Sequence, residues 1–329
     1  MVMTTGALSI GAYVQGFTSL AYFLLGVNII IYTVLTVFTM ARVCFFFPQL
    51  RADLMGHAKG PGFFTLVAGT CVFGSQIYLL TNMIIIPLLF WGIGIFLWLL
   101  VMYTFFTSVT IRKNKPTLLK GINGAWLIAA VGTQSISILG TLLSPSFTIG
   151  KEMVLFFTLC MYFLGCMLYL NIITLIFYRF TFLRLDFEAL TPPYWINMGA
   201  VAITTLAGAT LISHANQFAL LKEITPFLKG FTLFFWVSGT WWIPLLFILM
   251  IWRHVVHRYP LSYDPQVWGM AFPFAMYTLS TWQLSLALEL PFISMISRIS
   301  IFPAILFYLF VFGSFLHYLY KDIHVRISS

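Results

Sequence analysis

Few residues in the hydrophobic part of this sequence could act as an acid, a base or a metal ligand. The central turns of ten apolar stretches contain no Asp, Glu, Lys or Arg, whereas five of these stretches are rich in Gly, Ser, Thr and Gln. A charge inside a bilayer is costly, and membrane proteins that keep one commonly use it for proton transfer, ion pairing or substrate binding. Polar helices without such a charge instead predict a narrow, neutral pore.

The remaining polar residues give no support for catalysis, which would need convergent acid, base or metal groups. His254 and His257 have the spacing of two metal ligands on one helix, but no third ligand lies nearby in the sequence. We expect them to form part of a basic cluster at a helix end. The four cysteines lack metal-ligand spacing, and no nucleotide-binding or nucleophile motif occurs. We therefore expect no enzyme, no metal and no cofactor.

Composition places these residues in a membrane. The chain has 329 residues, of which 61% are hydrophobic and 8% charged, whereas ordinary soluble domains have about 25% charged residues. This composition predicts an all-α integral membrane protein with a single transmembrane domain over residues 1–329. One span needs about 20 apolar residues, which gives ten predicted helices, at residues 1–15, 20–47, 62–81, 84–110, 123–144, 152–178, 194–213, 228–252, 267–288 and 297–320.

The two ends of the predicted bundle differ in charge. With ten spans, one side of the membrane holds both termini and 13 of the 17 Lys and Arg residues, and the other side holds Lys151, Lys222, Lys229 and Arg298. The positive-inside rule predicts a multi-pass protein of the plasma or inner membrane with both termini in the cytoplasm. The net charge of +9 then reflects topology rather than nucleic-acid binding. A second interpretation of this charge is that it attracts anions to the cytoplasmic mouth of the pore.

The first predicted helix is short for a span. It has neither the basic segment nor the cleavage site of a signal peptide. We expect the chain to be trimmed just before or within it.

The predicted helices alternate in composition along the chain. Odd-numbered helices are rich in small and hydroxyl residues, as in WLIAAVGTQSISILG, whereas even-numbered helices are bulkier, as in FPAILFYLFVFGSFLHYLY. Small residues permit close helix packing or leave room for a pathway. The strict alternation favours an inner ring of five odd helices around a pore and an outer ring of five even helices. Candidates for lining the pore are Thr70, Thr133, Gln134, Thr204, Thr205 and Thr278. The alternative for each is hydrogen bonding between helices.

The ninth predicted helix contains the one evident barrier. Pro273 removes a backbone hydrogen bond, which predicts a kink and a freed carbonyl. Phe272 directly precedes the kink, and in a pore without fixed charge a large apolar ring can close the path sterically and by dewetting. The alternative is that Phe272 simply packs against lipid or neighbouring side chains, as many of the 35 Phe residues in the chain must do.

The ten-span pattern, the segment HAKGPGFF from His57 to Phe64, and Trp268 followed by Phe272-Pro273 resemble one known family. It is the tellurite-resistance/C4-dicarboxylate transporter family of the voltage-dependent anion channel superfamily, which includes slow-type anion channels of plants and malate and sulfite transporters of fungi. The resemblance implies five helical hairpins around a central pore, a homotrimer with one pore per subunit, and small inorganic or carboxylate anions as substrates. It also implies a gate at Phe272, with a contribution from Phe63 or Phe64. This chain has His57-Ala58 where the family commonly has His-Pro.

These observations predict passive transport of small anions through a neutral pore in the lipid bilayer. The alternative is a secondary carrier of C4-dicarboxylates such as malate, with or without proton coupling, or a transporter of tellurite or sulfite. Proton coupling normally needs an intramembrane carboxylate or histidine. The sequence has none away from the predicted interfaces, which favours the channel.

Overall fold

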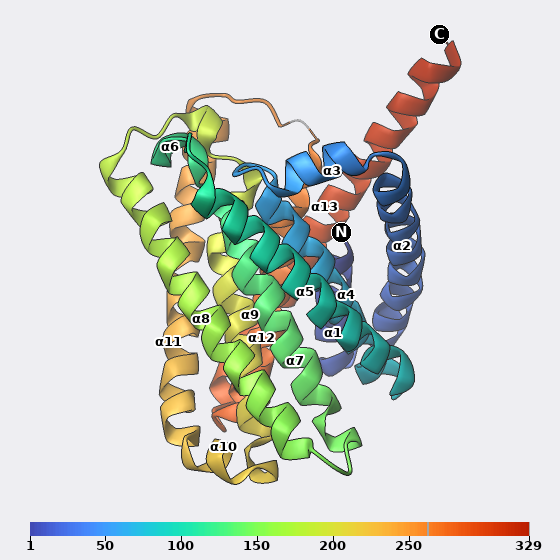
Figure 1. The fold of residues 1–329 in the computed structure, drawn as a ribbon, viewed down its shortest axis with the longest axis vertical. Coiled ribbons are helices and arrows are strands. Elements are labelled where there is room, and N and C mark those ends of the chain that lie inside the picture. The colour runs from blue at the N-terminus through green and yellow to red at the C-terminus, as the bar shows by residue number, and fades with distance from the viewer. Residues whose placement is uncertain (262, 329) are drawn as a thin grey trace.

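The computed structural model describes residues 1–261 and 263–328, and in that part of the chain every regular element is a helix (Figure 1). Long helices run side by side in a bundle, and short helices and loops connect them at its two ends. The outward faces carry many exposed Phe, Leu, Ile and Val side chains, such as Phe38, Phe23 and Leu306. Such faces are stable in lipid rather than in water. The predicted all-α membrane protein is thus confirmed.

Two sets of long helices alternate along the described chain. The inner set comprises α1 (Val2–Val14), α4 (Phe64–Thr81), α7 (Ile128–Leu143), α9 (Ile196–Ser213) and α12 (Trp268–Ala287). The outer set comprises α2 (Thr18–Phe45), α5 (Ile85–Ile111), α8 (Lys151–Phe182), α11 (Thr225–Ile251) and α13 (Pro291–Ser328). Each predicted range overlaps one of these helices. The largest differences are at α13, which ends at Ser328 rather than at residue 320 and begins at Pro291 rather than at residue 297. Proline is well accepted in the first turn of a helix.

The inner helices contact one another in a closed series. Contacts run from α1 to α4, α7, α9 and α12, and α12 returns to α1. Each outer helix packs on the inner helix that precedes it in the chain. In the most apolar segment of each helix, 94% of the residues of α7 and α9 are buried, against 22% for α2, α11 and α13. The inner helices, which are rich in small residues, are therefore surrounded by other helices, whereas the bulky residues of the outer helices face outward.

Glycines explain how closely the two sets approach. A Cβ at Gly140 of α7 would lie 2.6 Å from Thr158 Cγ2 of α8, and a Cβ at Gly208 of α9 would lie 2.1 Å from Thr232 Oγ1 of α11. Neither position has room for a larger side chain. Close packing is thus one use of the small residues, as in other membrane bundles.

Eight helices in the described part of the chain are long and apolar enough to cross a bilayer. The two remaining members of the inner and outer sets, α1 and α12, both belong to the inner set. Helix α1 has only 13 residues, and α12 carries Trp, Tyr, Ser, Thr and Gln side chains that lower its hydropathy. The structure shows a membrane protein with many spans, while the number of ten spans stays a prediction.

One end of the bundle holds most of the basic loops, and we call it the basic end. Helices α2, α5, α8 and α11 end there, and the short helices α3 (Phe47–Leu54) and α6 (Leu118–Gly121) lie beside them (Figure 1). The short α10 (Ala219–Glu223) lies at the opposite end. The sequence did not predict these three helices, because each is too short to show a hydrophobic period.

Four inner helices begin at the basic end with the same local structure. A 3₁₀ turn precedes each of them: η1 (Gly60–Phe63), η2 (Gly124–Leu127), η5 (Pro192–Trp195) and η8 (Pro265–Val267). Proline and glycine favour such tight turns at the start of a helix. The recurring turn brings the amino ends of α4, α7, α9 and α12 to one level of the bundle.

Candidate functional site

A cavity of about 970 Å³ lies where the amino ends of the inner helices meet. We call it the central cavity. Every inner helix contributes to its wall: Val2 to Thr4 from α1, Thr65 from α4, Ile128 from α7, Ile196 from α9, and Trp268 from α12. Side chains of α2 and α5 complete the wall. The cavity is therefore formed by the closed series of inner helices, not by one hairpin alone.

The electrostatic character of the central cavity comes mainly from the backbone. An α-helix has free N–H groups and a partial positive charge at its amino end, which favours anions. Four such ends, those of α4, α7, α9 and α12, border this cavity beside the first residues of α1, and of the described side chains in its wall only Lys59 is charged. The rest of the wall is mostly apolar. This arrangement attracts an anion weakly and from several directions, without a fixed charge in the wall beyond Lys59.

Phe272 lies at the wall of the central cavity and is only 2% exposed. Pro273 follows it inside α12, and proline leaves the carbonyl four residues earlier, at Gly269, without its helical partner. Gly269 also lines the cavity. The predicted pair of a large ring and a freed carbonyl thus lies next to the open space.

Helix α9 provides the space for this ring. A Cβ at Gly199 would lie 2.9 Å from Pro273 Cγ and 3.3 Å from two ring carbons of Phe272. A side chain at position 199 would therefore push against both residues. The absence of a side chain there allows the ring to pack against the α9 backbone.

The structure places the other two predicted gate residues outside the wall of the central cavity. Phe64 is fully buried and packs edge-on against Phe105 of α5, with ring centroids 6.1 Å apart. Phe63 lies at the start of the same helix, where the Arg42 guanidinium is 6.0 Å from its ring centroid. The two rings are directed to α5 and to the basic end, and Phe272 is the one of the three that borders the cavity.

The six polar residues predicted to line a pore take different positions. Thr70 lines the central cavity, and its hydroxyl lies 3.1 Å from the Tyr32 hydroxyl. Thr133 accepts a hydrogen bond from Trp98 Nε1 of α5, and Gln134 donates one to the Tyr162 carbonyl of α8. These two side chains connect inner to outer helices.

The other three hydroxyls also have protein partners. Thr278 of α12 lies 2.9 Å from Ser300 Oγ of α13. Thr204 and Thr205 each donate to a backbone carbonyl of their own helix α9. The alternative considered from the sequence, hydrogen bonding between helices, therefore describes Thr133, Gln134 and Thr278, and also Thr70, whose partner Tyr32 belongs to α2.

Several polar residues in the cavity wall were missed, and Thr4 is the one whose side chain lacks a partner. Thr4 is 1% exposed, and its Oγ1 has no hydrogen-bond partner in the described structure. A buried hydroxyl without a partner is costly unless water or a ligand satisfies it. The sequence signal was present, since Thr4 opens the first small-residue helix, but nothing in the sequence indicates which face of that helix borders the cavity.

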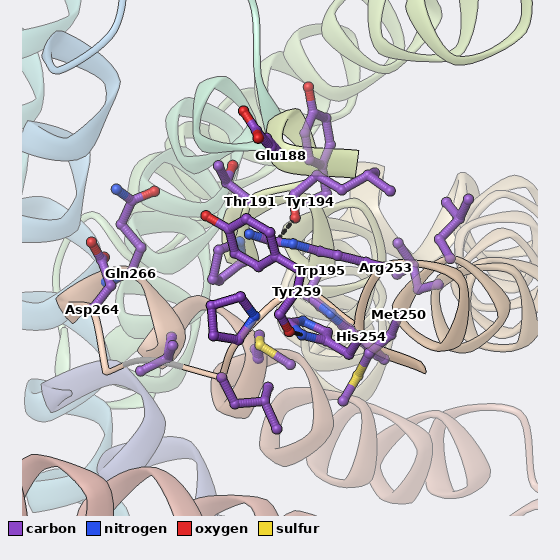
Figure 2. Close-up of a pocket in the computed structure, with 18 residues that line it drawn as sticks. Glu188, Thr191, Tyr194, Trp195, Met250, Arg253, His254, Tyr259, Asp264 and Gln266 are labelled. Atoms are coloured by element: carbon purple, nitrogen blue, oxygen red, sulfur yellow. Dashed lines mark hydrogen bonds between the residues drawn. The ribbon is translucent and has the colours of Figure 1, made fainter. Parts of the chain in front are cut away.

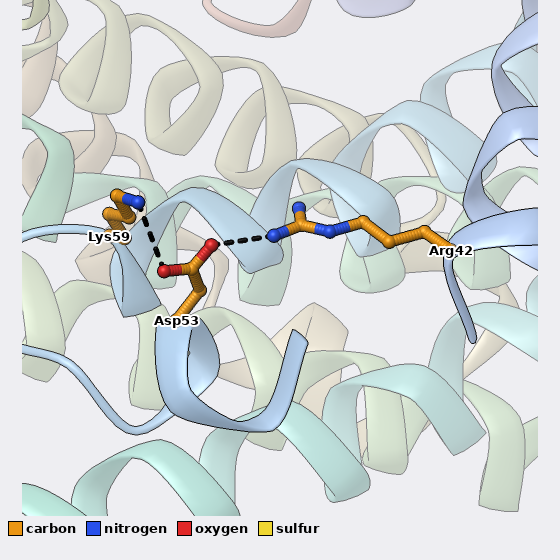
Figure 3. Close-up of polar contacts among 3 residues, drawn as sticks. All are labelled: Arg42, Asp53 and Lys59. Atoms are coloured by element: carbon orange, nitrogen blue, oxygen red, sulfur yellow. Dashed lines mark hydrogen bonds and ion pairs between the residues drawn. The ribbon is translucent and has the colours of Figure 1, made fainter. Parts of the chain in front are cut away.

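Lys59 is held at the cavity wall by an ion-pair network at the basic end (Figure 3). Its Nζ lies 3.0 Å from one Asp53 oxygen, and Arg42 Nη2 lies 2.5 Å from the other. The hydrogen bond from Lys59 holds the pKa of the Asp53 carboxyl below its usual value. The side chains of Lys59 and Arg42 are 71% and 44% exposed, so the network fixes positions more than it stabilises the fold.

The histidines singled out in the sequence lie at the basic end. His57 neighbours Trp126, with ring centroids 6.1 Å apart. Burial lowers its pKa, and the nearby Arg112 and Lys115 lower it further. His257 stacks on Phe187, and His254 Nδ1 lies 2.9 Å from the Tyr259 carbonyl oxygen. No group of three His, Cys, Asp or Glu side chains in the described part of the chain could hold a metal ion.

Comparisons with known proteins agree with this architecture. A family model described as voltage-dependent anion channel matches residues 1–316. The chain is 39% identical over 153 residues to an uncharacterized membrane protein of Mycobacterium tuberculosis, which covers 46% of this chain and 77% of that protein. It is 27% identical over 290 residues to an uncharacterized transporter of Methanocaldococcus jannaschii, with 85% and 81% covered.

Proposed function

The chain belongs to the voltage-dependent anion channel family, and from this membership we propose that it conducts small anions passively through the central cavity and past Phe272. The family comprises membrane transporters and channels for anions rather than enzymes. In this proposal ten helices span the membrane as five hairpins, with the inner set around the pathway. The basic end faces the cytoplasm, because the positive-inside rule assigns the basic loops to that side.

The observation that carries the proposal is the meeting of four helix amino ends, those of α4, α7, α9 and α12, around one cavity. Their partial positive charges favour an anion over a cation. A site made of dipoles and apolar walls also releases an ion readily, which conduction requires. No described carboxylate lies in the wall, so an anion meets no fixed negative charge there.

Phe272 is proposed as the barrier in this pathway. Its ring is nearly fully buried between the cavity and α9. An apolar ring at a narrow point excludes water and ions together. We leave Phe63 and Phe64 outside the proposed gate because their rings pack toward α5 and Arg42. The homotrimer with one pore per subunit remains a prediction from the resemblance.

Anion flux into liposomes tests the proposal. Purified wild-type protein and Phe272→Ala are reconstituted side by side, since a closed gate alone would keep wild-type flux low. We expect chloride and nitrate flux that follows an imposed membrane potential and needs no pH gradient. Two results would contradict the proposal: flux no greater than in protein-free liposomes for both proteins, or saturable malate uptake that depends on a pH gradient. The second result would favour the carrier.

A further inference from the structure

A second cavity, of about 210 Å³, lies at the basic end beside the central cavity (Figure 2). It is bordered by the end of α11, the segment before α9 and the segment before α12. Thr191 and Gln266 line both cavities, so these two residues form a shared wall. We call the second cavity the Arg253 pocket, after the residue at its centre.

Arg253 is an unusual residue to find buried. It is 8% exposed and lies in a π-helical turn (Trp252–Val256) that continues α11. Such turns are rare and occur frequently at functional sites. Its Nη1 donates to the Leu190 carbonyl, and its guanidinium lies 4.3 Å from the centroid of the Tyr259 ring. Its Nε has no hydrogen-bond partner in the described structure.

No described carboxylate neutralises this buried charge. The ion pairs of the described chain join Arg42 and Lys59 to Asp53, and Arg184 to Asp186. Asp264 lines the pocket, but its Oδ1 accepts a hydrogen bond from the backbone N–H of Gln266. Glu188 is exposed to solvent. Figure 2 shows both carboxylates at the edges of the pocket, away from the guanidinium.

A second buried cation adds to the positive potential. Arg179 is 6% exposed and donates to the Ile122 carbonyl and the Tyr194 hydroxyl, and its Nε also lacks a partner. Tyr194 lines the Arg253 pocket. A buried guanidinium without a counter-ion is strongly unfavourable. One buried guanidinium lines this pocket and the other donates to a tyrosine that lines it, which indicates that an anion completes the site.

We propose that the Arg253 pocket binds one small oxyanion of the phosphate class. The guanidinium fork suits two oxygens of the same group better than a single spherical ion. Thr191 and Gln266 supply neutral hydrogen-bond donors from the wall shared with the central cavity. The pocket lies at the basic end of the bundle, where α11 ends, and we name two sources of the phosphate group: free phosphate and a phospholipid headgroup. This site does not depend on conduction through the central cavity.

Binding to the purified full chain tests the proposal. Delipidated protein in detergent is titrated with inorganic phosphate by calorimetry, at constant ionic strength and with chloride as the competing anion. In parallel, protein in nanodiscs of phosphatidylcholine with or without phosphatidylglycerol is examined by native mass spectrometry for retained lipid. Saturable phosphate binding identifies free phosphate as a ligand, and retained phosphatidylglycerol identifies the headgroup. Either result supports the proposal if it depends on Arg253.

Variants establish that dependence. We expect Arg253→Gln to weaken binding at least about tenfold, equivalent to about 1.4 kcal/mol. Arg184→Gln removes the same charge from a side chain that is 90% exposed and should bind like wild type. Should Arg253→Gln fail to fold, Arg253→Lys keeps the charge but lacks the fork, and it should also bind more weakly. The proposal is overturned if wild-type protein binds neither phosphate nor the lipid, or if both Arg253 variants bind as wild type does.

Discussion

The central cavity and the Arg253 pocket share a wall, yet they offer an anion opposite environments. The central cavity is lined by helix amino ends and apolar side chains, and its one charged side chain, Lys59, is largely exposed. The Arg253 pocket is several times smaller and contains a buried guanidinium with an unpartnered Nε. Dipoles spread over a wide cavity attract an ion without retaining it, whereas a buried full charge needs a resident counter-ion. In our two proposals, this difference lets one region pass anions and the other hold one.

The largest expected effect separates these two roles. Phe272→Ala should raise anion flux at least about tenfold, as lowering a barrier by about 1.4 kcal/mol would do, and should leave phosphate binding unchanged. Arg253→Gln should weaken phosphate binding and leave anion flux unchanged. Liposome flux and calorimetry on the same two preparations measure both properties. Phe274→Ala is the matched control, since Phe274 stacks on Phe307 with centroids 4.3 Å apart and lies outside the cavity wall. If one variant changed both properties, the two regions would act as one site.

A second prediction concerns how tightly the central barrier is fitted. Gly199→Ala should destabilise the protein by about 1–3 kcal/mol, the usual cost of overpacking, because the new Cβ would lie 2.9 Å from Pro273 Cγ. Thermal unfolding in detergent measures the change. Gly230→Ala is the control, because a Cβ there meets no atom within 4 Å, and it should be neutral or stabilising. Equal effects of the two substitutions would show that α9 does not support the ring.

A third prediction tests whether the exposed charge of Lys59 has only a small effect on anion conductance, as its exposure implies. Lys59→Gln should lower anion conductance about twofold at low salt, in line with the small energies of exposed charges, and the difference should vanish at high salt. Lys113→Gln removes an exposed lysine at the same end that is outside the wall and should have no effect. A salt-independent loss of conductance for Lys59→Gln would mean that the cavity, like the Arg253 pocket, depends on a fixed charge.

The smallest effect is expected at His57, beside the mouth of the central cavity. Its pKa is lowered in the folded protein, first by burial and then by Arg112 and Lys115. As pH falls below about 6.5, the ordinary value, the unfolded chain binds a proton that the folded chain binds less readily, so stability decreases. His57→Gln should flatten the dependence of unfolding temperature on pH between 7 and 5, while His317→Gln, on an exposed part of α13, should not. If His57→Gln left the dependence of unfolding temperature on pH unchanged, His57 would not be the cause of that dependence.

The sequence predicted the long helices well and their contacts poorly. The ten ranges were predictable because apolar length and the alternation of small and bulky residues are local properties. The Phe272-Pro273 pair was recognisable because proline has a defined effect on a helix. The direction of a hydroxyl was not predictable: Thr133 bonds to Trp98 on a neighbouring helix, whereas Thr4 borders the cavity. Both lie in similar small-residue stretches, and only the packing of neighbours distinguishes them.

The Arg253 pocket was also outside the reach of sequence reasoning. Arg253 flanks the two histidines, His254 and His257, for which the sequence predicted a basic cluster at a helix end. The structure instead buries Arg253, because the segments that carry Leu190 and Tyr259 fold over its side chain. Burial of a charge by loops depends on tertiary contacts that no periodic pattern records.

The most direct test of the central claim is the unitary anion conductance of a size series at position 272, recorded in planar bilayers with symmetrical chloride. Conductance should rise from Phe272 to Phe272→Leu, Phe272→Val and Phe272→Ala, because each smaller side chain leaves a wider, wetter path beside the cavity. The same series at Phe274 should leave conductance unchanged. Equal conductance for all four residues at position 272 would contradict the account, since the ring would then not be the barrier between the central cavity and the other side of the membrane.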